Sequence, residues 1–265
     1  MLDRIDAANN LKHIAGVRLE LIERGSGRPL LLLHPEIGIK ARDPVIDSLA
    51  RSFRVLAPSH PGFGRSELPR GMTTVDDLAY FYLDLMDALD LREAVLAGLS
   101  FGGWIAAEIA IKSSGRIAQL ILADAVGIKL GDREHRDIAD IFTLRQSDVD
   151  RLAYHDPKLA AVDHATISED DALIMFRNRE ATALFAWSPY MYDPKLAGRL
   201  HRIRMPTLIL WGASDRIASP DYGRAYGKLI PGAQFELIDQ AGHYPHLEQP
   251  ELFAQKIADF VSRTS

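Results

Sequence analysis

Short apolar runs alternate with amphipathic helical patterns along most of this chain. The runs have strand length, and several are apolar at every position, which is typical of a sheet buried on both faces. The helical pattern over Thr73–Asp90 begins with a Thr-x-x-Asp cap and repeats apolar residues every three or four positions. This alternation predicts an α/β fold with a doubly wound, mostly parallel sheet. The expected strands are Val17–Ile22, Leu30–Leu33, Arg54–Ala57, Ala94–Leu99, Leu120–Asp124, Thr207–Trp211 and Gln234–Ile238, with further helices over Gly102–Ser114 and Pro250–Arg263.

One long stretch interrupts this alternation. Residues 127–204 have polar, helical patterns and no convincing strand. We therefore expect a core domain formed by residues 1–126 and 205–265, with residues 127–204 inserted as a helical cap between two strands. An insertion at the carboxyl end of such a sheet would lie over a site as a lid.

Composition and charge exclude several classes of function. The chain has 265 residues, 47% of them hydrophobic, and a net charge of −5 with no basic patch that would suit nucleic acid. It contains no cysteine, which excludes disulfides, thiolate metal sites and a cysteine nucleophile. No apolar run approaches the roughly 18 residues of a membrane span, and the start has no apolar stretch typical of a signal peptide. We expect a cytoplasmic protein with a small-molecule substrate and no nucleic-acid or membrane partner. The oligomeric state stays open, with a homodimer among the alternatives.

The strongest chemical motif is "GLSFG", Gly98 to Gly102, which a strand enters and a helix leaves. The spacing predicts a sharp strand-to-helix turn, where side chains at the two flanking positions would clash. Such a turn lifts Ser100 above the sheet edge at the N-terminus of a helix. The alternative is a glycine-rich turn that only packs the helix on the strand.

A serine is a poor nucleophile without a base, and the base needs an orienting acid. His243 follows the last expected strand, and His246 is a competitor better suited to a structural role. Asp215 follows another apolar strand and gives the chain order Ser, Asp, His. Asp124 also ends a strand and is the second candidate acid, although it could instead cap the entry to the insertion.

These motifs together resemble the α/β-hydrolase fold, of the esterase and carbon–carbon hydrolase kind with a helical cap. The resemblance extends from about Val17 to Val261. It implies Ser100 as nucleophile, His243 as base and Asp215 as acid. The matching segments are "LLLLHPEIG", "VLAPSHPGFGRSE", "AGLSFGG", "LILWGASDRI" and "AGHYPHLEQPELF", in the second of which His60, Pro61, Gly62 and Gly64 are expected to shape a loop near the site.

Acyl transfer also needs hydrogen-bond donors for the oxyanion. One expected donor is the backbone N–H of Phe101, and the other lies in "HPEIG". Because Pro35 has no N–H, that second donor should be the N–H of Glu36, with His34 bracing the loop. An ionised carboxylate beside an oxyanion would oppose it by several kcal/mol at an effective dielectric of about 20. The Glu36 side chain therefore turns away, or carries a proton, or serves a chemistry other than simple ester hydrolysis.

The cap offers residues for a pocket wall. Trp187, Tyr190, Met191 and Phe142 are the candidates for substrate binding, together with Glu36, and a tyrosine hydroxyl would be available to a substrate. The alternative is that they pack the cap onto the sheet. The chain has no glycine-rich phosphate motif and no histidine or carboxylate cluster with metal-ligand spacing, so we expect no cofactor and no metal.

The sequence thus predicts a cofactor-independent serine hydrolase acting on a small to medium, partly apolar carbonyl compound, most simply a carboxylic ester. A carbon–carbon bond hydrolase or another triad-based lyase is the nearest alternative, because this fold hosts many reactions. A ligand-sensing protein that turns over slowly and signals through the cap is the alternative from another class.

Overall fold

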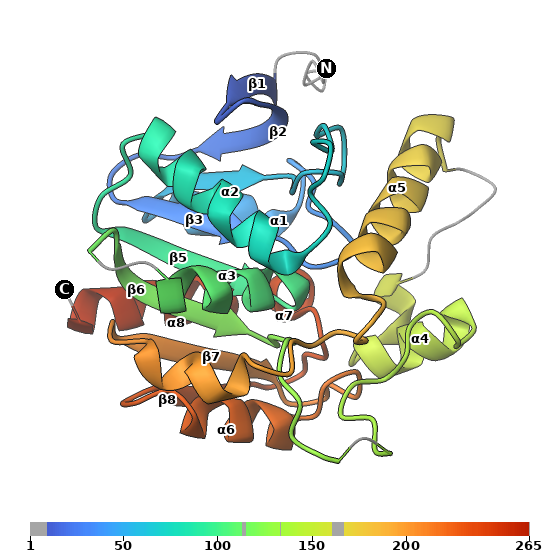
Figure 1. Cartoon of the computed structure of the whole chain (residues 1–265). Helices are drawn as coiled ribbons and strands as arrows, with labels where there is room; N and C mark the ends of the chain where they lie inside the picture. The colour runs from blue at the N-terminus through green and yellow to red at the C-terminus, as the bar shows by residue number, and fades with distance from the viewer. Residues whose placement is uncertain (1–9, 113–114, 133, 161–166, 265) are drawn as a thin grey trace.

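The computed structural model describes residues 10–112, 115–132, 134–160 and 167–264. The described residues form one eight-stranded sheet with the order β1-β2-β4-β3-β5-β6-β7-β8 (Figure 1). The first two strands in that order pair antiparallel, as do the second and third, and the remaining neighbours are parallel. The strands are β1 (Leu11–Ile14), β2 (Val17–Arg24), β3 (Pro29–Leu33), β4 (Arg54–Pro58), β5 (Ala94–Leu99), β6 (Ile117–Ala123), β7 (Thr207–Gly212) and β8 (Gln234–Ile238).

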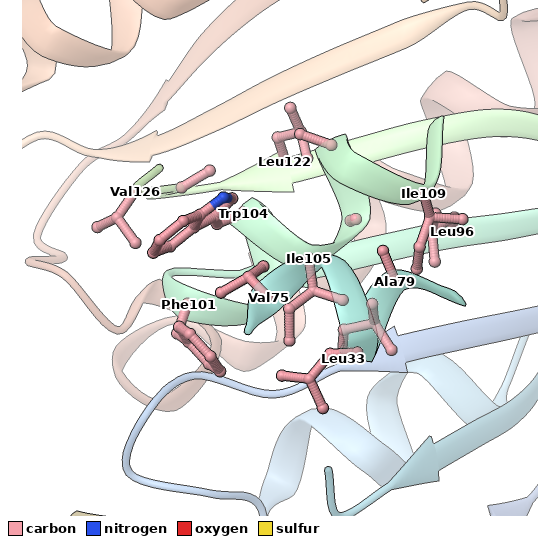
Figure 2. Close-up of a cluster of buried hydrophobic side chains, with 14 of the residues drawn as sticks. Leu33, Val75, Ala79, Leu96, Phe101, Trp104, Ile105, Ile109, Leu122 and Val126 are labelled. Atoms are coloured by element: carbon pink, nitrogen blue, oxygen red, sulfur yellow. The ribbon is translucent and has the colours of Figure 1, made fainter. Parts of the chain in front are cut away.

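Helices cover both faces of the sheet. Leu30 and Leu32 of β3 point into one apolar layer with α1 and α8, while Leu31 and Leu33 point into the opposite layer with α2, α3 and α6. Figure 2 shows this second layer, where Trp104 and Ile105 of α3 lie among side chains of α2 and the sheet. The predicted doubly wound, mostly parallel fold is confirmed. These helices are α1 (Pro44–Ala50), α2 (Val75–Ala88), α3 (Phe101–Lys112), α6 (Pro220–Lys228) and α8 (Pro250–Thr264), with the short α7 (Pro245–Glu248) before the last.

The helix expected over Thr73–Asp90 is α2, which begins two residues later. Its start is set by a capping box, in which the Thr74 hydroxyl accepts from the N–H of Asp77 at 3.1 Å. Oδ2 of Asp77 in turn accepts from the N–H of Thr74 at 2.9 Å. Thr74 is therefore the cap itself and lies outside the helix.

The stretch expected to form a cap contains α4 (Gln146–Ala153), η2 (Pro157–Ala160), α5 (Glu169–Ala186) and η3 (Ala197–Arg202) between β6 and β7. α4 and α5 lie together at one end of the sheet, on the right in Figure 1. Asn178 of α5 donates from Nδ2 to the carbonyl of Ile37 at 2.9 Å, and its Oδ1 accepts from the N–H of Gly64 at 2.8 Å. The helix is thereby tied to the loops that follow β3 and β4.

Some expectations fall on residues that the structure does not describe. These are the start of the chain over residues 1–9, residues 113–114 at the end of the expected helix Gly102–Ser114, and residues 133 and 161–166 of the expected cap. Within the described ranges, no helix has the length and apolarity needed to cross a membrane.

Candidate active site

Ser100 occupies a tight turn between β5 and α3. Its φ of +47° lies in the left-handed region, which a side chain rarely adopts and which here marks a turn held under strain. A Cβ on Gly98 would lie 2.3 Å from the carbonyl oxygen of Gly102. A Cβ on Gly102 would lie 2.2 Å from the carbonyl oxygen of Leu33, at the end of the neighbouring strand. Both glycines are therefore needed for the close approach that places Ser100 at the carboxyl edge of the sheet.

The structure brings Ser100, His243 and Asp215 together in one hydrogen-bonded line. Nε2 of His243 lies 2.7 Å from Oγ of Ser100, and its Nδ1 lies 2.8 Å from Oδ2 of Asp215. Oδ1 of Asp215 accepts from the N–H groups of Ile217 at 2.8 Å and Ala218 at 3.1 Å, which fixes the carboxylate. All three side chains are buried.

The environment of His243 favours its protonated form. Burial by itself lowers the pKa of this imidazole, but the Asp215 carboxylate more than offsets that effect through charge and a hydrogen bond, and Glu36 adds to it. The net result is a pKa raised above the usual histidine value.

Asp124, the second candidate acid, lies beside this line but does not contact His243 by a hydrogen bond. Its Oδ1 accepts from the N–H of Gly212 at 2.8 Å, and its Oδ2 is buried with no hydrogen-bond partner among the described residues. Burial, followed by the charge of Asp215, raises the pKa of Asp124 well above its usual value. The environment of Asp124 therefore favours its protonated form.

One atom from each of Asp124, Asp215 and His243 lies within 4.8 Å of the others, the spacing that a metal site requires. Both ring nitrogens of His243 are, however, within hydrogen-bond distance of Ser100 and Asp215. Binding a metal through this imidazole would break one of those contacts, so the donor set fits a hydrogen-bonded triad better than a metal site.

Glu36 points toward the nucleophile. Its Oε2 lies 2.8 Å from Oγ of Ser100, and its Oε1 accepts from the hydroxyl of Tyr244 at 2.5 Å. The side chain is only 6% exposed, and no lysine or arginine pairs with it among the described residues. Of the alternatives for this side chain, the one in which it turns away is therefore wrong, because the loop after β3 directs it at Ser100.

Tyr244 is the site residue that sequence reasoning missed. It directly follows His243, and burial, followed by the charge of Glu36, raises the pKa of its hydroxyl well above the usual value, so it acts as a donor. Its place beside the candidate base was the only signal in the sequence. His246, the competitor base, is buried on α7 against Tyr244 and Phe253 and makes no hydrogen bond to Ser100.

Two buried histidines brace the loop that carries Glu36. Nδ1 of His34 lies 2.6 Å from the carbonyl of Pro35, and its Nε2 accepts from the N–H of His60 at 2.9 Å. Nε2 of His60 donates to the carbonyl of His34 at 2.9 Å, and its Nδ1 lies 2.5 Å from the hydroxyl of Tyr82. Every contact is satisfied when both rings are neutral. Burial lowers the pKa of His34 to about 4 and that of His60 well below its usual value.

The two expected oxyanion donors lie on segments that meet at the nucleophile. Phe101 is the first residue of α3, and Glu36 lies in a turn closed by the N–H of Gly38 and the carbonyl of Pro35 at 2.9 Å. Within the described ranges, neither the N–H of Phe101 nor that of Glu36 has an acceptor in the protein. Both N–H groups can therefore donate hydrogen bonds to an atom of a bound molecule.

Among the described residues, the four cap residues expected to bind substrate make no hydrogen bond to Ser100, His243 or Asp215. Trp187 is 53% exposed and packs its ring on Phe142, with centroids 5.2 Å apart, while Met191 is buried. The hydroxyl of Tyr190 accepts from the N–H of Ile141 at 2.9 Å and donates to the carbonyl of Ala139 at 2.8 Å. The cap backbone thus uses the Tyr190 hydroxyl, so Tyr190 does not supply the tyrosine hydroxyl expected for a substrate. Whether the four side chains line a pocket stays a prediction.

Known proteins resemble this chain over nearly its whole length. A 2-hydroxymuconate semialdehyde hydrolase of Pseudomonas sp. (strain CF600) is 28% identical over 263 residues, covering 94% of this chain and 92% of that protein. The solved meta-cleavage product hydrolase from Pseudomonas fluorescens IP01 is 22% identical with a TM-score of 0.78, covering 97% and 100% of the two chains. A thermophilic esterase from Thermogutta terrifontis is 26% identical with a TM-score of 0.68, covering 96% and 97%.

The family model agrees with the architecture described above. The model described as "Alpha/beta hydrolase family" matches residues 30–256, which include β3, the turn at Ser100 and the loop of His243. Because this match covers most of its length, the chain belongs to the alpha/beta hydrolase family, with which its eight-stranded, mostly parallel sheet agrees.

Proposed function

We propose that this chain is a serine hydrolase in which Ser100 is the nucleophile, His243 the base and Asp215 the acid that orients it. The observation that carries the proposal is the line of contacts from Ser100 Oγ to His243 Nε2 at 2.7 Å and from His243 Nδ1 to Asp215 Oδ2 at 2.8 Å. A nucleophile within reach of a base, itself held by a carboxylate, is the arrangement that acyl transfer requires.

In the first half of the reaction, Oγ of Ser100 attacks the carbonyl carbon and its proton passes to Nε2 of His243. The electron pair of the carbonyl moves to its oxygen, which accepts hydrogen bonds from the N–H groups of Phe101 and Glu36. As the intermediate collapses, the imidazolium gives that proton to the leaving group. Water then attacks the acyl-enzyme, His243 takes a proton from it, and Ser100 is regenerated when that proton returns. No group beyond water and the substrate enters these steps.

A carboxylic ester of small to medium size is the simplest substrate for these steps. The 26% identical esterase supports this choice, since its similarity extends over the whole chain. A carbon–carbon bond hydrolase is the second candidate, supported by the 28% identical 2-hydroxymuconate semialdehyde hydrolase. In that case the leaving group is a carbanion, which takes its proton from the same imidazolium.

The test uses a fluorophosphonate probe and two substrate panels. The probe should label Ser100 in the wild-type protein and should not label Ser100→Ala, whereas labelling at another residue would overturn the proposal. Hydrolysis of p-nitrophenyl esters of graded chain length is then compared with cleavage of 1,3-diketones. Faster ester turnover supports an esterase, and faster diketone cleavage supports the second candidate. Labelling of Ser100 without turnover on either panel would instead point to a slow ligand-sensing protein.

A further inference from the structure

The hydroxyl of Ser100 lies between two groups that both accept hydrogen bonds when deprotonated. Oε2 of Glu36 is 2.8 Å from Oγ on one side, and Nε2 of His243 is 2.7 Å from it on the other. A serine hydroxyl has one proton and can donate to only one of them. If that were the only proton, the other contact would bring two lone pairs together at under 3 Å inside a buried site.

Both contacts become hydrogen bonds when two protons lie along the line Oε2–Oγ–Nε2, besides the proton that His243 keeps on Nδ1 toward Asp215. In one arrangement Ser100 donates to an ionised Glu36 and the His243 imidazolium donates to Ser100. In the other, a carboxylic acid at Glu36 donates to Ser100 and Ser100 donates to a neutral His243. The two arrangements have the same charge and interconvert when both protons shift along the line Oε2–Oγ–Nε2.

We propose that Glu36, Ser100 and His243 share two protons in the resting enzyme, and that the extra proton makes the Glu36 carboxyl a donor to the oxyanion when Ser100 attacks. This inference rests on the proposed function of Ser100 as nucleophile. It assigns the Glu36 side chain a catalytic part in addition to its backbone N–H.

The number of charges in the buried site supports the two shared protons. Asp215 already places one carboxylate against His243, and no lysine or arginine pairs with Glu36 among the described residues. With a neutral imidazole and an ionised Glu36 the buried line would carry two negative charges, whereas the second proton leaves one. The charge of Glu36 also contributes to the raised pKa of His243, as expected if a proton is drawn into the line. The other titratable groups coupled to this cluster are Tyr154, Tyr190, Asp215, Tyr244 and His246. Asp124 acts on Asp215, and Glu248 acts on Asp124 and Tyr154.

The reaction step balances with this extra proton in place. Oγ of Ser100 forms its bond to the carbonyl carbon, the Ser100 proton moves to Nε2 of His243, and the carbonyl electron pair moves to oxygen. The Glu36 proton stays on its carboxyl and turns from Oγ, which has become an ester-type oxygen, to the adjacent oxyanion. A neutral carboxylic acid kept for donation to an oxyanion removes the repulsion that an ionised Glu36 would exert.

With this arrangement, we expect the nucleophilicity of Ser100 to fall at alkaline pH. Above the pH at which the cluster loses its second proton, an ionised carboxylate competes for the Ser100 hydroxyl and repels the oxyanion. At low pH, both sites of the line are protonated and His243 cannot accept. The rate should therefore follow a bell whose two limbs belong to the cluster as a whole.

The experiment measures the second-order rate of fluorophosphonate labelling from about pH 5 to about pH 10, which needs no knowledge of the substrate. Wild type is compared with Glu36→Gln, whose amide still donates to Oγ but cannot ionise. We expect the alkaline limb in wild type and its absence in Glu36→Gln, whose plateau rate should fall below that of wild type because an amide donates more weakly to the oxyanion than a carboxylic acid does. The acid limb of Glu36→Gln should not move to lower pH, because the Glu36 carboxyl beside a neutral His243 already carries no charge.

A second variant keeps the test decisive if Glu36→Gln fails to fold. Tyr244→Phe removes the donor to Oε1 of Glu36, which disfavours the ionised carboxylate and should move the alkaline limb to higher pH. Identical alkaline limbs in wild type and both folded variants would overturn the inference while Ser100 stays the nucleophile. Loss of labelling at every pH in a folded Glu36→Gln protein would also overturn it. Failure of the wild type to label at all would count against the proposed function itself.

Discussion

Asp215, and not Asp124, is hydrogen-bonded to His243, although one atom of each of the three side chains lies within 4.8 Å of the others. The difference comes from their strands. Asp124 directly follows β6 and its Oδ1 accepts from the N–H of Gly212, whereas Asp215 lies three residues beyond β7 with Oδ2 directed at Nδ1 of His243. The raised pKa of Asp124, caused by burial and by the charge of Asp215, disfavours a second negative charge beside the triad.

This relationship predicts unequal effects of two matched substitutions. Asp215→Asn removes the charge that holds the imidazole and should slow labelling of Ser100, and turnover, by about 10³ to 10⁴-fold. Asp124→Asn keeps the shape of a side chain that makes no hydrogen bond to His243 and whose pKa is raised by burial, so its effect should stay within about ten-fold. The measurement is the labelling rate of both variants at neutral pH, with the unfolding midpoint as the control for folding. A larger loss in Asp124→Asn would reassign the acid.

The sequence was sufficient to predict seven of the eight strands, the turn at Ser100 and the meeting of Asp215 and His243 with that serine. Parallel strands buried on both faces leave continuous apolar runs, and the flanking glycines of "GLSFG" are required by contacts of 2.2 to 2.3 Å that any Cβ would make. These are local signals. The strand β1, by contrast, was not predicted, because Leu11–Ile14 is a short edge strand whose pattern is mostly exposed.

The contacts of Glu36 could not be predicted in the same way. The sequence identified a carboxylate next to an expected oxyanion donor, but its direction depends on a loop braced by His34, His60 and Tyr82, which come from three separate segments. The position of Tyr244 depends likewise on how the loop after β8 packs. For Tyr190, the aromatic pattern gave no means of telling a free hydroxyl from one bonded to Ala139 and Ile141.

The brace under Glu36 predicts different effects for two buried tyrosines. Tyr82 and Tyr226 are both fully buried, but the Tyr82 hydroxyl lies 2.5 Å from Nδ1 of His60, while the Tyr226 hydroxyl has no hydrogen-bond partner in the part of the chain that the structure describes. Tyr82→Phe leaves a buried ring nitrogen unsatisfied and should lower the free energy of unfolding by about 1–3 kcal/mol. Tyr226→Phe should be neutral or stabilising. Urea unfolding of both variants checks this, and equal losses would contradict it.

Buried neutral histidines should make the fold sensitive to acid. Burial lowers the pKa of His246 to about 3, and the charges of His243 and His34 act in the same direction. As the pH falls below about 6.5, the unfolded chain binds a proton at this histidine, whereas the folded protein does not. The contribution of the neutral ring to the free energy of unfolding is therefore complete above about pH 6.5 and is lost as the pH falls toward 3.

The expected loss for each such histidine is about 2 kcal/mol between neutral pH and about pH 5. His246→Leu should remove that share of the acid sensitivity, while His13→Leu, on an exposed position of β1, should leave it unchanged. Urea unfolding midpoints at the two pH values give the comparison. An unchanged pH dependence in His246→Leu would show that this ring is not the source.

Asn178 should control how firmly α5 rests on the loops beside the active site. Its side chain is 4% exposed and makes the two hydrogen bonds to Ile37 and Gly64, so Asn178→Ala leaves the carbonyl of Ile37 and the buried N–H of Gly64 without their partner. We expect the free energy of unfolding to fall by about 2–4 kcal/mol, and amide exchange near residues 37–38 and 62–64 to accelerate. Leu173→Ala, on an exposed position of the same helix, is the matched control and should change neither. Accelerated exchange along the whole of α5 in both variants, with none in the two loops, would instead mean that the helix is held by its own packing and not by this side chain.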